Sequence, residues 1–119
     1  GIFYFLRVIY QDILILFDQK NIRIFDICYF LTGLLAEEAE DVFTQMKWVE
    51  NVKSVIAGYE SVVNLSEREK YAVPYVMESI EILFVAYFIS IKDTKHANDA
   101  YNVFHFIQNC KSDIKNAIG

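Results

Sequence analysis

The chain has 119 residues, 55% of them apolar, and a formal net charge of −5. This length corresponds to a single domain, residues 1–119, and the apolar content is too high for a disordered chain. Lysine and arginine are scattered and form no basic stripe, so we expect no nucleic-acid partner. Four glycines and one proline provide few breaks, which favours long helices over a sandwich or barrel with many turns.

The N-terminal segment, Ile2–Phe17, has apolar residues at the three- and four-residue spacing of a helix, although residues 8–18 would also suit a buried strand. It contains Arg7 and Asp12 and is shorter than the roughly 20 apolar residues that cross a bilayer. It also lacks the small-residue cleavage site of a signal peptide. We therefore expect no membrane insertion, no export and a cytoplasmic location.

The middle of the chain contains the clearest boundary signals. An apolar segment at 22–35 precedes acidic residues 36–41, whose charge would stabilise the N-terminus of a helix running from about Glu38 to Val63. Ser66–Glu69 (SERE) fits a capping box, in which the serine and glutamate side chains each accept a hydrogen bond from a free amide at a helix start. Pro74 suits the first turn of this next helix or a kink in it.

The last third of the chain completes the helical pattern. The helix after the capping box is apolar on both faces as far as Ile91, which is typical of a central helix in a bundle. Lys92–Thr94 ends it and caps a final helix with one apolar face. These segments predict an all-α fold, an irregular bundle of about five helices. Cys28 and Cys110 lie within apolar helical patterns and are expected to be buried free thiols.

Two carboxylates form the candidate site. Glu78 and Glu81 are the only charged residues between Lys70 and Lys92, and their spacing places them on one helix face. Because a buried carboxylate needs a partner, two interpretations are open. The pair lines a cleft that binds a small polar or cationic ligand, or its face meets water or an arginine.

No complete catalytic constellation is visible. His96 and His105 are nine residues apart, which does not suit two metal ligands on one helix face, and no carboxylate completes a metal-binding spacing. The chain has no glycine-rich phosphate loop, nucleophile elbow or Cys-x-x-Cys motif. We therefore expect no metal, no cofactor and no catalytic residue.

Three short motifs follow one another in a recognisable order: NIRIFDICYFL at 21–31, IAGYE at 56–60, and LSERE at 65–69 with Val73-Pro74. They resemble, in order and spacing, the Arg-x-(Tyr/Phe)-Asp, Gly-Tyr and Leu-(Ser/Thr)-x-x-Glu…Leu-Pro stretches of the aminoglycoside phosphotransferase and choline-kinase-like family. The similarity runs roughly from Leu14 to the C-terminus.

This resemblance implies the helical C-terminal part of a kinase-like fold, in which Asp26 supports the catalytic loop and Glu78 and Glu81 lie on helices that can face the substrate. Members of the family transfer the γ-phosphate of ATP to a hydroxyl of a small molecule. The ATP-binding lobe and the His-Gly-Asp loop have no counterpart here, and Leu16 stands where the family has a magnesium-binding aspartate. We therefore expect a truncated substrate lobe that is inactive in phosphoryl transfer on its own.

The alternative function is a helical protein-interaction module without a small-molecule site. The unusual apolarity predicts an exposed apolar surface and a homodimer formed through it, with the N-terminal run included. A charge at Phe3 or Leu6 would then weaken the association. The ligand, the oligomeric state and whether the chain is full length or a fragment stay open at this point.

Overall fold

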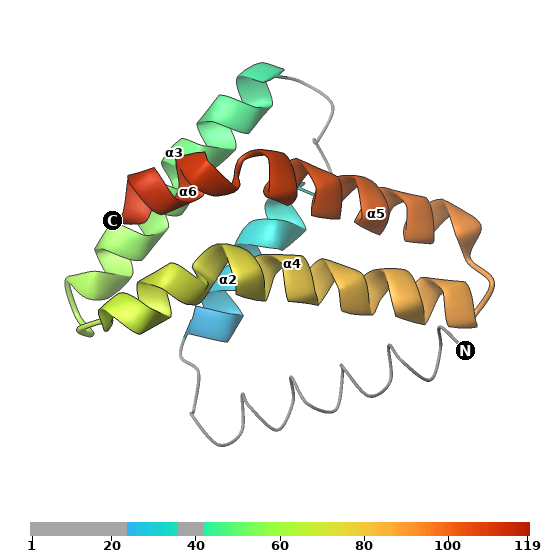
Figure 1. Cartoon of the computed structure of the whole chain (residues 1–119), viewed down its shortest axis with the longest axis horizontal. Coiled ribbons are helices and arrows are strands. Elements are labelled where there is room, and N and C mark those ends of the chain that lie inside the picture. Colours follow the sequence, from blue (N-terminus) through green and yellow to red (C-terminus); the bar gives the residue numbers. More distant parts are fainter. Residues whose placement is uncertain (1–23, 36–41) are drawn as a thin grey trace.

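The computed structural model describes residues 24–35 and 42–119. Within these ranges the chain forms five helices and no strand: α2 (Ile24–Leu35), α3 (Val42–Glu60), α4 (Glu67–Ser90), α5 (Thr94–Asn109) and α6 (Lys111–Ile118). Helices α4 and α5 lie side by side and antiparallel, α2 packs against α4, and α3 and α6 meet at the end of the bundle where α4 begins (Figure 1). The predicted all-α bundle is confirmed.

Several predictions fall outside the described residues. These are the N-terminal helix Ile2–Phe17, the strand alternative at 8–18, the position of Leu16 in the family comparison, and the acidic segment 36–41. They stay predictions.

Some expectations about the elements differ from the structure. Helix α3 ends at Glu60, three residues before the predicted end at Val63. The final predicted helix is two helices, because Cys110 adopts φ −104° and ψ 17° between α5 and α6. The Cys110 amide still donates to the Phe106 carbonyl and the Cys110 carbonyl still accepts from the Ile114 amide, so the apolar periodicity continues across the break and conceals it. Pro74 lies inside α4 and beyond its first turn, so the expectation of a first-turn position is wrong, and the alternative of a kink stays a prediction.

All five helices contribute to one core. Trp48 of α3 is buried at its centre, where its indole Nε1 donates to the carbonyl of Leu31 at 2.8 Å and its ring meets the edge of Phe106 at 5.6 Å between centroids. A buried indole normally needs such a partner for its N–H. This one residue therefore joins α3 to the end of α2 and to α5. The most deeply buried side chains around it are those of Cys28, Leu31, Val52, Ile56, Met77, Ile107 and Ile114.

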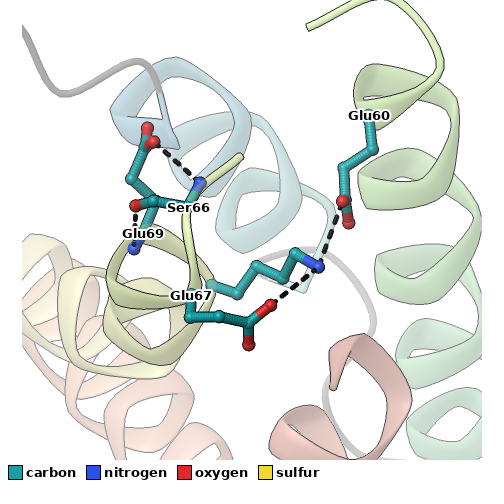
Figure 2. Close-up of polar contacts among 5 residues, drawn as sticks. Glu60, Ser66, Glu67 and Glu69 are labelled. Carbon is teal, nitrogen blue, oxygen red and sulfur yellow. Dashed lines mark hydrogen bonds and ion pairs between the residues drawn. The ribbon is translucent and has the colours of Figure 1, made fainter. Parts of the chain in front are cut away.

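The start of α4 is held by polar contacts. The hydroxyl of Ser66 accepts from the Glu69 amide and the Glu69 carboxylate accepts from the Ser66 amide, both at 3.1 Å, which confirms the capping box (Figure 2). Lys70 Nζ lies 3.1 Å from Glu60 Oε2 and 3.6 Å from Glu67 Oε1. The Glu60 contact ties the first turn of α4 to the last turn of α3.

The turn from α4 to α5 has a different chemistry. Lys92 has a φ of 61°, the left-handed conformation that usually falls to glycine after a helix. The Asp93 amide donates to the Phe88 carbonyl and the Lys92 amide to the Ile89 carbonyl, the hydrogen-bond pattern of a Schellman motif. Asp93 then caps α5 through a side-chain hydrogen bond from the His96 amide at 3.2 Å. The predicted stop and cap at Lys92–Thr94 are confirmed.

Candidate functional site

Glu81, one of the two predicted site residues, lies in the middle of α4 in contact with α2. Its side chain is buried, with 5% exposed, and burial raises the pKa of its carboxyl to about 7, an effect that a hydrogen bond with the Thr32 hydroxyl partly opposes. No lysine, arginine or histidine of the described residues lies within ion-pair distance. The carboxyl is therefore isolated from positive charge, the situation in which desolvation favours the neutral acid.

The Thr32 hydroxyl is already engaged elsewhere. Its Oγ1 donates to the carbonyl of Tyr29, one turn earlier in α2, at 3.1 Å. Because a hydroxyl has a single hydrogen, the Tyr29 carbonyl and an ionised Glu81 share or compete for it. A protonated Glu81 that donates to Thr32 Oγ1 satisfies both groups, whereas an ionised carboxylate would compete with the Tyr29 carbonyl.

Glu78, the second predicted residue, has a different partner. Its Oε1 forms an ion pair with Lys111 Nζ of α6 at 2.5 Å. The two carboxylates thus share one side of α4 but contact different helices, α6 and α2. Neither residue lines either of two surface grooves that described residues form. Their role as ligand-binding residues stays a prediction.

The two grooves are open to solvent and lie elsewhere. One groove, of about 450 Å³, lies along the contact between α3 and α6, beside Cys110. The other, of about 510 Å³, runs between the last turns of α4 and the first turns of α5, and its walls include Val85, Ile89, Ala97 and Tyr101. The second groove is the more apolar, and it belongs to the part of α4 that sequence analysis placed in the core.

That part of α4 is the main surface feature that sequence reasoning missed. Residues 82–89, ILFVAYFI, are all apolar, yet none of them is buried. We refer to them as the open half of α4. Ile89 is 44% exposed, and the rings of Phe84 and Phe88 stack at 6.1 Å along the helix surface. The expectation that α4 is central along its whole length is wrong for this half.

The cysteines and histidines form no further site in the described ranges. Cys28 is buried and Cys110 is half-buried, and both are free thiols. Burial raises the pKa of Cys28 to about 12 and, together with the charge of Asp113, that of Cys110 to about 11. Both thiols are thus poor nucleophiles near neutral pH. No group of three or more metal-ligating side chains gathers in this part of the chain.

Helix α4 is also long and apolar enough to cross a membrane, the one such helix in residues 24–35 and 42–119. Core helices of soluble proteins pass the same test of length and composition. In the structure α4 packs against α2, α5 and α6. The expectations of a cytoplasmic location and of no membrane partner stay predictions.

No family model, curated protein or solved structure matches the chain. The resemblance to the aminoglycoside phosphotransferase family therefore rests on the short motifs alone and stays a prediction.

Proposed function

We propose that this chain is a helical interaction module that forms a homodimer through the open half of α4. One observation carries the proposal: eight consecutive apolar residues of α4, the longest helix in the described part of the chain, are half-buried or exposed, and none is buried. A helix that is apolar on all sides is normally buried on all sides. A contiguous exposed apolar surface is typical of a protein–protein contact.

A second copy of the chain is the partner that fits this surface. The apolar centre around Ile89 is bordered by the α4–α5 turn and the start of α5, which carry Lys92, Lys95 and Asp99, all exposed. In a two-fold dimer the same surface meets itself, so lysines of one copy can approach the aspartate of the other. A surface with an apolar centre and both signs of charge at its edge is complementary to itself.

Sedimentation equilibrium of the wild-type chain and of two variants tests the proposal. We expect the wild type to dimerise and Ile89→Lys to be monomeric, because a buried ammonium without a partner opposes association. Val62→Lys is the matched control, since Val62 is 85% exposed and lies outside α4. Circular dichroism verifies that both variants remain helical. A wild type that stays monomeric at high concentration, or a control that dissociates equally, contradicts the proposal.

A second candidate is the substrate lobe of a small-molecule kinase, inactive in phosphoryl transfer on its own. The observation in its favour is Glu81, a buried carboxyl without a cationic partner in the described residues. A cationic group of a ligand would supply that partner, with Glu78 nearby on the same side of α4. Calorimetry with choline, an amino sugar and an amino acid tests this candidate. Binding that weakens in Glu81→Gln and Glu78→Gln supports it, and the absence of heat with all three ligands rejects it.

A further inference from the structure

Four side chains from α4 and α6 form a cluster on the surface of the bundle. Tyr71 and Tyr75 lie one turn apart on α4, and Lys111 and Lys115 lie one turn apart on α6. Lys115 Nζ donates to the Tyr75 hydroxyl at 2.9 Å, and the two tyrosine hydroxyls are 3.5 Å apart. We call these four residues the tyrosine–lysine cluster.

Both lysines approach the same ring. The distance from Nζ to the centroid of the Tyr75 ring is 4.7 Å for Lys111 and 4.9 Å for Lys115, and Lys115 is also 4.8 Å from the Tyr71 centroid. The two ammonium groups are thus closer than the distance over which salt screens charges, about 10 Å at an ionic strength of 0.1 M. They repel each other.

Among the described residues, only one of the two lysines forms an ion pair. Glu78 pairs with Lys111, whereas no carboxylate of the described residues lies within ion-pair distance of Lys115. One positive charge therefore remains in the cluster, on a chain whose net charge is −5. An anion placed beside Lys115 would offset the repulsion between the lysines.

The tyrosines add hydrogen-bond donors at the same place. The Tyr75 oxygen accepts from Lys115, and whichever tyrosine donates to the other, one phenolic hydrogen of the pair is left for an outside acceptor. Hydrogen bonds with Lys115 and then Tyr71 lower the pKa of the Tyr75 hydroxyl, which makes it a stronger donor. The site is accessible, because Tyr71 is 62% and Tyr75 is 38% exposed.

We propose that the tyrosine–lysine cluster binds the phosphoryl group of a phosphate monoester. Lys115 supplies the charge, and the phenolic hydrogen that the tyrosine pair leaves free donates to a phosphoryl oxygen. A phosphoryl group matches the cluster better than a carboxylate does, because it has three terminal oxygens and up to two negative charges. This site is separate from the proposed dimer surface and does not depend on it.

Titration with inorganic phosphate, followed by amide NMR shifts of α4 and α6 at constant ionic strength, tests the proposal. We expect saturable shifts around Tyr71, Tyr75 and Lys115. In Lys115→Met, which loses a charge-assisted hydrogen bond, the affinity for phosphate should fall by a factor of roughly ten or more. Tyr71→Phe removes a single hydroxyl and should weaken binding by a smaller factor. Lys53→Met, which removes an exposed lysine of α3, is the matched control and should bind as the wild type does.

The remaining outcomes are decisive as well. O-phospho-L-serine and glycerol 2-phosphate distinguish a phosphorylated side chain from a small phosphate ester, and saturable binding of either supports the site. Shifts that chloride reproduces at equal ionic strength, or that survive unchanged in Lys115→Met, overturn it. Should Lys115→Met lose its helical circular dichroism, Tyr71→Phe with Lys53→Met as control decides the question.

Discussion

The two halves of helix α4 differ both in apolarity and in burial, and the two differences run in opposite directions. In the first half the side chains at Val73, Pro74, Val76, Met77, Ile80 and Glu81 are buried. In the open half, residues 82–89, no side chain is buried although every one is apolar. The more polar stretch of the helix is thus the one that lies in the core.

The difference follows from which other helices are present. The first half of α4 passes α2 and the region where α3 and α6 meet, whereas the second half extends beyond α3 and α6 beside α5 (Figure 1). Burial of a side chain requires neighbours on every side. Apolarity alone therefore does not place a residue in the core, and in a small bundle it marks a surface that is available for another molecule.

The largest expected effect comes from truncating one apolar side chain in each half. Met77→Ala removes a fully buried side chain and should lower the free energy of unfolding by about 2–5 kcal/mol, since it leaves a cavity in the core. Ile89→Ala is the matched change in the open half and should alter the stability of the monomer by about 0.5 kcal/mol or less. Urea denaturation below the concentration at which the chain dimerises measures both.

The ratio of these two changes in unfolding free energy tests whether the two halves of α4 differ in burial. If Ile89→Ala destabilises the monomer as strongly as Met77→Ala, the open half is covered by the chain itself, and the proposed dimer surface is lost. If the two differ as expected while Ile89→Ala weakens self-association, the division of α4 into two halves is sharpened.

Glu81 lies at the boundary between the halves and should make stability depend on pH. Its pKa is about 7 in the folded chain against 4.5 for the free group, so the folded state holds its proton more tightly. The contribution of Glu81 to stability is therefore greatest below about pH 4.5 and falls as the pH rises to about 7, by a total of about 3 kcal/mol. Glu81→Gln cannot ionise and should be more stable than the wild type at pH 8 by up to that amount.

Urea denaturation of both proteins at pH 5, 6, 7 and 8 provides the measurement. Asp93 has a pKa below its usual value, so its opposite contribution falls at more acidic pH and does not mask the effect. The difference between Glu81→Gln and the wild type should be small at pH 5 and grow toward pH 8. A difference that is constant with pH would show that Glu81 titrates normally and is not isolated from charge.

The elements of this fold could be predicted well from local patterns. The capping box at Ser66–Glu69 and the Asp93 cap of α5 depend on side-chain contacts between residues three apart. The stop at Lys92 depends on backbone hydrogen bonds between residues no more than five apart. All of these contacts are local in the sequence. The helical class follows from the apolar periodicity. The break at Cys110 could not be predicted, because the backbone hydrogen bonds around it continue nearly as in a single helix.

The functional surfaces could not be predicted in the same way. Glu78 and Glu81 were recognised as unusual, but their partners Lys111 and Thr32 come from helices far along the chain. Lys115 and Tyr75 are likewise 40 residues apart. Such contacts depend on how helices pack, which no local pattern specifies. The unburied state of residues 82–89 depends in addition on which of the described helices pass beside them.

The start of α4 offers a smaller test of how firmly its buried half is anchored. Ser66→Ala removes one member of the capping box and should lower the free energy of unfolding by about 1 kcal/mol, because an amide at the helix start loses its acceptor. Ser54→Ala in the exposed middle of α3 is the control and should be neutral or slightly stabilising. Thermal denaturation by circular dichroism measures both. Equal effects of the two changes would show that the capping box contributes nothing beyond helix propensity.

The end of α4 gives the smallest effect and the opposite sign. Lys92 holds a φ of 61°, a conformation that costs an L-residue about 1–2 kcal/mol and glycine almost nothing. Lys92→Gly relieves this strain but also gives the unfolded chain more freedom, so we expect a net gain of about 0.5–1 kcal/mol. Lys95→Gly, one turn later inside α5, is the control and should destabilise by about 1 kcal/mol. If Lys92→Gly stabilises the fold but weakens dimerisation, then the lysine at this turn is retained for the contact that the open half of α4 makes, and the strain at the end of the helix belongs to the interface.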